Sequence, residues 1–158
     1  MKIPSLLALV VLMLLSILAI AVGGFLTSLS VSDWYLTLNK PAWNPPNWIF
    51  GPVWTTLYIM MAITAWLVWI EKDRPLVRSA MVAYGLQLFL NVCWSGMFFA
   101  LENPLLGVID IVLLWIALAW TLERFWKVKQ VATFLMVPYF LWVTFAMVLN
   151  FTIWRLNG

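Results

Sequence analysis

The sequence predicts an all-α integral membrane protein, a bundle of five transmembrane helices. Composition is the first indication, because the 158-residue chain is 65% hydrophobic and only 9% charged. A soluble domain is nearer half apolar and a quarter charged. Spacing is the second, because the charged residues fall in narrow bands that leave five apolar spans of 20 to 24 residues. A helix of that length crosses about 30 Å of hydrocarbon, so lipid is the expected solvent.

The predicted helices form one domain, residues 1–158, and cover about residues 3–26, 48–70, 79–101, 103–122 and 131–154. We expect the first span to remain as a helix, because its apolar run is too long for the core of a signal peptide. Short connections make the later helices antiparallel neighbours. Asn44 is the predicted N-cap of the second helix, with Pro45 at its first position. Pro104 suits the start of the fourth helix.

Only the first loop, residues 27–47, is long, and it is unusually rich in tryptophan and proline. Long loops in compact domains are usually functional or disordered, and disordered sequence is poor in aromatic residues. We therefore predict a structured lid over one end of the bundle. Aromatic rings held on a stiff loop favour a pocket for a flat apolar molecule.

Basic residues predict the orientation of the chain. The side that holds the N-terminus carries seven of them: Lys2, Lys72, Arg74, Arg78, Arg124, Lys127 and Lys129. The other side carries only Lys40 and Arg155. Because basic residues collect on the cytoplasmic side, we expect a cytoplasmic N-terminus, with the lid and the C-terminus outside. The bacterial cytoplasmic membrane is the expected location. These cations form no continuous patch, so we expect no nucleic-acid partner.

Composition also argues against several chemistries. The chain has no histidine and a single cysteine, Cys93, so we expect no metal site and find no nucleophile–base pair. Asp110 is the only acid well inside a span. An intramembrane carboxylate is costly and raises the question of function. We favour a structural hydrogen bond to a neighbouring helix, and proton handling is the alternative.

Three predicted helices carry stripes of aromatic, amide and small residues at intervals of three or four. The stripes comprise Trp54 and Tyr58 on the second helix, Gln87, Asn91, Trp94 and Ser95 on the third, and Pro138, Trp142, Ala146 and Asn150 on the fifth. Trp54, Trp94 and Trp142 lie too deep to belong to an interfacial aromatic belt. Their position is consistent with lining a cavity and with plain core packing, and we favour the cavity.

These residues also match a known family. The matching elements, in order along the chain, are Trp34-Tyr35, Lys40-Pro41, Trp43-Asn44-Pro45-Pro46, Phe50 with Val53-Trp54 and Leu57-Tyr58, Asn91 with Trp94-Ser95 and Phe98-Phe99, Asp110, and Pro138-Tyr139 with Trp142, Phe145-Ala146 and Leu149-Asn150. The sequence thus resembles the TspO/translocator protein family of tryptophan-rich sensory proteins and peripheral-type benzodiazepine receptors. The resemblance covers essentially the whole chain.

The resemblance implies five packed helices, commonly in a homodimer, in contact with membrane lipid and without a required cofactor. It implies that the ligand is a porphyrin such as protoporphyrin IX, or another hydrophobic small molecule such as a sterol. Carried over by motif, the expected ligand-binding residues are Tyr35, Trp43, Trp54, Tyr58, Asn91, Trp94, Trp142, Ala146 and Asn150. Phe151 replaces the tyrosine of the sterol motif proposed for animal members, so we favour porphyrin.

Four functions remain open from the sequence. A membrane receptor for tetrapyrroles, which moves or regulates them, is the leading hypothesis. An enzyme that degrades porphyrin under light is the second, and the resemblance implicates Trp54 and Trp142 in such a reaction. A small-molecule carrier is the third, and a structural or regulatory partner protein is the fourth.

Overall fold

The computed structural model describes residues 5–71 and 75–158, and within these ranges it contains helices and no strand. Five helices are long and apolar enough to cross a membrane, which confirms the predicted fold class. They are α1 (Ser5–Ser28), α3 (Asn47–Trp69), α4 (Val77–Ser95) with its π-helical extension η1 (Gly96–Ala100), α5 (Pro104–Val128) and α6 (Gln130–Asn157). A single turn, α2 (Trp34–Thr37), lies within the first loop.

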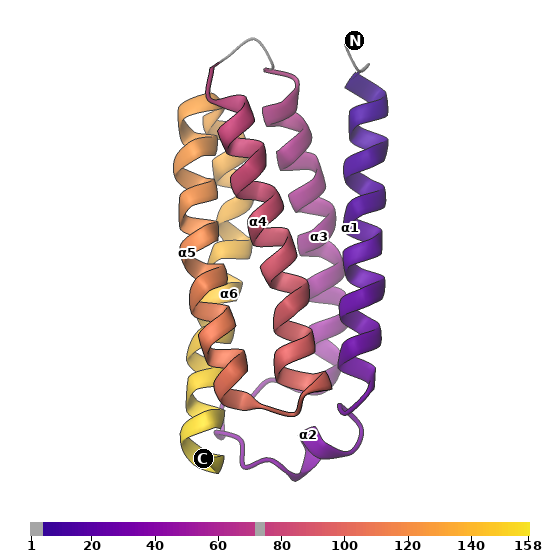
Figure 1. Cartoon of the computed structure of the whole chain (residues 1–158), viewed down its shortest axis with the longest axis vertical. Coiled ribbons are helices and arrows are strands. Elements are labelled where there is room, and N and C mark those ends of the chain that lie inside the picture. The colour runs from indigo at the N-terminus through magenta and orange to yellow at the C-terminus, as the bar shows by residue number, and fades with distance from the viewer. Residues whose placement is uncertain (1–4, 72–74) are drawn as a thin grey trace.

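The five long helices run side by side along the long axis of the molecule (Figure 1). The N-terminal end of α1 and the C-terminal end of α6 lie at opposite ends of the bundle, as an odd number of spans requires. The loop between α1 and α3, residues 29–46, crosses the same end of the bundle as the end of α6 (Figure 1). We call this loop the lid.

The bundle has an apolar interior and an apolar exterior. Met61, Leu118 and Phe125 are completely buried between helices, whereas Phe89 and Phe134 are more than half exposed on the outside. A water-soluble bundle would cover such an exterior with charge. Because the outside is apolar, the protein is an integral membrane protein whose exterior contacts lipid.

The start of α5 follows the sequence prediction. Pro104 occupies the first turn, where its missing N–H costs no hydrogen bond. Asn103 is the N-cap, and its Oδ1 accepts a hydrogen bond from the backbone N–H of Leu106 at 3.1 Å.

The predicted N-cap of α3 is wrong. The helix begins at Asn47 and not beside Asn44, and Pro46 precedes it in an extended conformation with φ −57° and ψ 139°. Proline disfavours helical geometry in the residue before it, so the pair Pro45-Pro46 keeps the chain extended and delays the helix. The Asn44 side chain instead accepts from the Tyr35 hydroxyl and donates to the Pro45 carbonyl.

The end of α4 also differs from the regular helix that its sequence predicts. Residues Gly96–Ala100 form a π-helix, in which the Leu101 N–H donates to the Gly96 carbonyl at 2.9 Å. The widened turn carries Phe98 and Phe99, which are both buried. These two rings contact each other edge to face, with centroids 4.8 Å apart, and pack beneath the lid.

Four of the basic residues used for the orientation, Arg78, Arg124, Lys127 and Lys129, belong to the end of the bundle opposite the lid. Lys129 pairs there with Glu71 at 2.7 Å. Lys2, Lys72 and Arg74 lie outside the described residues.

Candidate ligand-binding site

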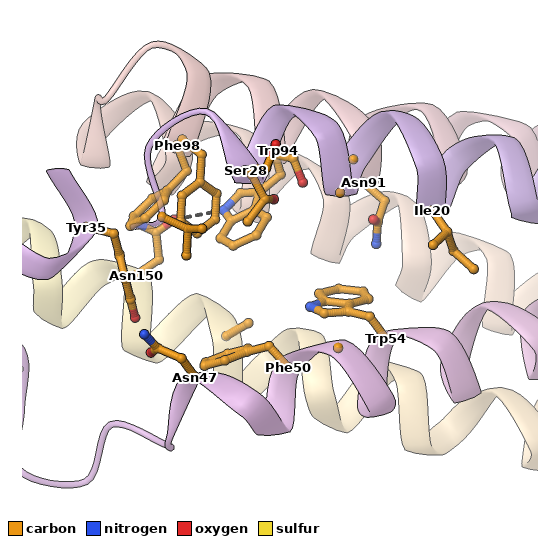
Figure 2. A pocket seen from close by; sticks show the side chains of 18 of the residues that line it. Ile20, Ser28, Tyr35, Asn47, Phe50, Trp54, Asn91, Trp94, Phe98 and Asn150 are labelled. Carbon is orange, nitrogen blue, oxygen red and sulfur yellow. Dashed lines mark hydrogen bonds between the residues drawn. The ribbon is translucent and has the colours of Figure 1, made fainter. Parts of the chain in front are cut away.

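A cavity of about 370 Å³ lies beneath the lid, enclosed by α1, α3, α4 with η1, and α6 (Figure 2). Its volume is within the usual range for small-molecule sites. The residues that line it include eight of the nine predicted from the sequence: Tyr35, Trp54, Tyr58, Asn91, Trp94, Trp142, Ala146 and Asn150. The stripes on the second, third and fifth predicted helices therefore face one another across the same space.

Trp43 is not among the lining residues. Its side chain is 48% exposed, and its ring meets the edge of Phe145 at a centroid distance of 5.9 Å. Phe145 in turn packs on Trp142, with centroids 5.4 Å apart. The Phe145 ring therefore separates Trp43 from the cavity wall. The place of Trp43 in the lid motif did not reveal this, because the residue lies in a tight turn in which the Asn44 N–H donates to the Pro41 carbonyl at 3.0 Å.

Trp54 is the centre of the aromatic wall. Its ring lies 6.0 Å from Tyr58, 6.2 Å from Tyr139 and 6.4 Å from Trp142, centroid to centroid. The two indoles are almost perpendicular, at 87°. Edge-to-face aromatic pairs are favourable beyond the area they bury, so these rings hold one another in fixed orientations. The result is a rigid aromatic wall along α3 and α6.

The floor of the cavity is a chain of buried hydrogen bonds between α3, α4 and α6. The Tyr58 hydroxyl donates to Asn91 Oδ1, and Asn91 Nδ2 donates to the Tyr139 hydroxyl at 2.6 Å. Tyr139 then donates to Gln87 Oε1 at 3.0 Å. All of these side chains are at least 95% buried. These side chains satisfy one another's polar groups. The hydrogen bonds therefore hold α3, α4 and α6 together, and the floor needs no polar partner from a ligand.

A second polar link ties α4, α5 and α6 together at the lid end of the cavity. Trp94 Nε1 donates to Asn150 Oδ1 at 2.9 Å, and Asn150 Nδ2 donates to the Pro104 carbonyl at 3.0 Å. This link depends on a close approach at Gly107. A Cβ atom there would lie 2.8 Å from Asn150 Oδ1 and 2.8 Å from Phe98 Cδ2.

Gly107→Ala should therefore disturb the cavity although residue 107 does not line it. The added methyl group must displace the Asn150 amide or the Phe98 ring, which weakens the Trp94–Asn150 hydrogen bond. Overpacking of this kind costs about 1–3 kcal/mol. We expect a lower melting temperature for Gly107→Ala, whereas Gly85→Ala, whose Cβ would meet nothing within 4 Å, should melt at or slightly above the wild-type temperature, because alanine favours a helix over glycine. Equal melting of Gly107→Ala and wild type would contradict this account.

One polar atom in the cavity wall has no partner. Trp142 Nε1 is buried and makes no hydrogen bond within the part of the chain that the structure describes. Buried N–H groups are nearly always paired. Trp142 lines the cavity, and a rotation of its ring would present this unpaired N–H to an acceptor atom on a bound molecule.

Asp110 Oδ2 does not make the hydrogen bond to a neighbouring helix that we expected from the sequence. Its side chain is 98% buried on α5, and Oδ2 has no hydrogen-bond partner among the described residues. Asp110 is also absent from the cavity lining. Neighbouring α4 offers Cys93 near this carboxyl group, but a thiol is only a weak donor.

Tyr35 closes the cavity from the lid. Its side chain is buried, and its hydroxyl donates to Asn44 Oδ1 at 3.3 Å. Burial raises the pKa of the Tyr35 hydroxyl above its ordinary value, and the Asn44 hydrogen bond offsets part of this shift. The phenol therefore stays neutral at physiological pH. Lys40 Nζ donates to the carbonyl of Tyr35 at 2.6 Å and lies 4.7 Å from the centre of the Tyr35 ring.

The wall formed by α1 was not predicted from the sequence. Ala19, Ile20, Gly23, Gly24 and Thr27 all line the cavity. Because α1 is apolar on every side, periodicity gave no indication of an inward face. The signal was the Gly23-Gly24 pair inside a helix, where glycine is unfavourable unless small size is needed. The Gly23 Cα lies so near α4 that an added Cβ would contact Ser95 Oγ at 3.4 Å.

Residues 9–155 match the TspO/MBR family. The match spans all five long helices and the lid. The chain belongs to the TspO/MBR family. It is 45% identical to the tryptophan-rich protein TspO of Chlorobaculum tepidum over 85% of this chain and 86% of the relative. It is 40% identical to the protein CrtK of Rhodobacter capsulatus, over 81% of each chain. It is 39% identical to the human translocator protein, over 78% of this chain and 75% of the relative.

The family match and the five apolar helices together identify an integral membrane protein. The described residues contain no group of three or more His, Cys, Asp or Glu side chains that could hold a metal ion. The features on which binding at this site would depend are therefore shape, aromatic surface and the unpaired indole N–H of Trp142.

Proposed function

We propose that this protein is a membrane receptor that binds protoporphyrin IX and related flat, largely apolar molecules in the cavity beneath its lid. The observation that carries the proposal is the wall of indole and phenol rings around Trp54, with one unpaired donor at Trp142. Flat aromatic surfaces bind flat conjugated rings through dispersion and burial. A single buried donor orients a ligand that carries an acceptor, such as a carboxylate or carbonyl oxygen.

Family membership supports this proposal, since the expected porphyrin ligand came from the same resemblance. We further propose the orientation indicated by the basic residues, with the N-terminus in the cytoplasm of a bacterium and the lid outside. Arg78, Arg124 and Lys127 at the end opposite the lid support it. The cavity then opens beneath the outer surface of the cytoplasmic membrane.

Trp142→Phe tests the proposed donor. This variant keeps an aromatic ring but loses the indole N–H and part of the ring surface, so a ligand acceptor loses its partner and the wall loses some contact area. We expect protoporphyrin IX to bind about tenfold more weakly, the loss of one hydrogen bond. Titration of purified protein in lipid nanodiscs, followed by the Soret absorption of the pigment, measures the affinity.

The matched control for this titration is Trp120→Phe. Trp120 lies on α5, is 36% exposed and does not line the cavity, so its variant should bind like wild type. Equal affinity of Trp142→Phe and wild type would refute the role of the donor. Absence of saturable binding by wild type would refute the proposed function itself.

A further inference from the structure

The geometry points to a lateral route for the ligand: we propose that flat amphipathic molecules enter the cavity from the membrane, through a slot between α1 and α3, while the lid stays closed. This proposal rests on the proposed function, and it adds that the ligand reaches the cavity from the lipid and not from water. A molecule that uses this route is dissolved in lipid, with its ring system in the acyl region and its acidic groups near the headgroups.

The slot has two edges, made by cavity-lining residues that are also exposed on the outside of the bundle. One edge is Gly24 and Ser28 on α1, and the other is Asn47, Gly51 and Thr55 on α3. Residues four apart lie on one face of a helix, so each set forms a continuous edge. Figure 2 shows side chains of α1, such as Ser28, on one side of the cavity and Asn47, Phe50 and Trp54 of α3 on the other.

Small side chains leave the slot open. A Cβ atom added at Gly24 or at Gly51 would meet nothing within 4 Å. The two hydroxyl groups bond to their own helices, because Ser28 Oγ donates to the Phe25 carbonyl at 2.7 Å and Thr55 Oγ1 to the Gly51 carbonyl at 2.9 Å. Apart from the Asn47 amide at the level of the lid, the edges therefore present little free polarity to an apolar molecule that passes between them.

The depth of the slot matches the upper part of one leaflet. Asn47 is the first residue of α3, and Thr55 lies eight residues further along the helix. At 1.5 Å per residue, the edge on α3 is about 12 Å long. It runs from the level of the lid, where lipid headgroups are expected, into the acyl region. An amphipathic ring system concentrates at this depth.

The lid, in contrast, is held closed by hydrogen bonds at its start and near its middle. Ser30 Oγ donates to the Phe99 carbonyl at 2.8 Å in a buried position. Near the middle of the lid, the Asn39 N–H donates to Asn157 Oδ1 at 2.8 Å, and Asn157 Nδ2 donates to the Asn39 carbonyl at 2.9 Å. Opening the lid would break these bonds and expose the buried Tyr35 ring. Passage through the slot breaks none of them.

The opposite ends of α1 and α3 are joined, so the slot is confined to the lid end. Trp66 Nε1 donates to the Ser5 carbonyl at 2.8 Å. Ala8 and Leu12 of α1 are buried in the same half of the bundle. The two helices can therefore separate slightly at the slot while they stay packed below it.

The test measures the rate at which protoporphyrin IX, preloaded into lipid vesicles, quenches the tryptophan fluorescence of the protein reconstituted in the same lipid. Gly24→Phe and Gly51→Phe place a ring in the slot, with the matched control Gly85→Phe. Gly85 is exposed on α4, does not line the cavity and has no neighbour within 4 Å of an added Cβ. Asn157→Ala removes the two hydrogen bonds that hold the lid at Asn39 and leaves the Ser30–Phe99 bond in place.

We expect both slot variants to associate and dissociate about tenfold more slowly, because a blocked path slows both directions. Gly85→Phe and Asn157→Ala should keep wild-type rates. The slot is refuted if the slot variants keep wild-type rates, if they lose equilibrium binding without slowing, or if Gly85→Phe slows equally. Faster association of Asn157→Ala alone would assign the route to the lid. Failure of wild type to bind at equilibrium refutes the proposed function instead.

Discussion

Trp54→Ala should weaken protoporphyrin IX binding by about 100-fold, the largest effect expected of any single change in the cavity wall. Trp54 contacts Tyr58, Tyr139 and Trp142 at once, so its removal deletes one ligand-facing surface and frees the rings that it holds in place. The loss has two sources. Contact area with the ligand disappears, and the remaining rings must be ordered again when the ligand binds.

The measurement is the same Soret titration, with Trp126→Ala as the control. Trp126 lies on α5, is 46% exposed, packs on Phe134 and does not line the cavity. It should leave the affinity unchanged. Because Trp54→Ala also opens a cavity that can cost about 3 kcal/mol of stability, Trp54→Leu serves as a second variant that fills more of the space. Wild-type affinity in both variants would contradict the assignment of the wall.

Asn91→Ala should destabilise the protein by about 2–4 kcal/mol, the largest stability effect that we expect. Asn91 accepts from Tyr58 and donates to Tyr139, and all three side chains are at least 95% buried. Its truncation leaves one buried hydroxyl donor and one buried hydroxyl acceptor without their partner. Each unsatisfied group then carries its full desolvation cost.

Thermal unfolding in a mild detergent, followed by circular dichroism, measures this loss as a lower melting temperature. Tyr58→Phe is the informative comparison, because Tyr58 is at the end of the chain of hydrogen bonds and its loss strands only Asn91 Oδ1. We expect Asn91→Ala to melt below Tyr58→Phe, and both to melt below wild type. The reverse order would mean that the network does not hold α3, α4 and α6 together as described.

The five transmembrane helices could be predicted because lipid imposes a simple demand on sequence. Long apolar runs and narrow bands of charge follow directly from the thickness of the hydrocarbon layer. The stripes were also visible, since Trp54 and Tyr58, or Trp142 and Ala146, recur at the helical period. The stripes line one cavity only if the three helices face one another. The family resemblance and the need to pair buried amides both favoured that arrangement.

Other features depended on local geometry that sequence patterns do not encode. Asn44 resembles an N-cap, but the following pair of prolines keeps the chain extended until Asn47. The π-helix after Ser95 replaces the expected α-helical turns and places Phe98 and Phe99. The hydrophobic pattern did not reveal the wall formed by α1, because a uniformly apolar helix has no polar face to mark its inner side.

A structure of the protein in lipid with protoporphyrin IX bound would show where the ligand lies. We expect the macrocycle in the cavity beneath the lid, against the Trp54 ring, with an acceptor atom within hydrogen-bond distance of Trp142 Nε1. A macrocycle bound on the lipid-facing exterior of the bundle, with the cavity beneath the lid empty, would contradict this expectation.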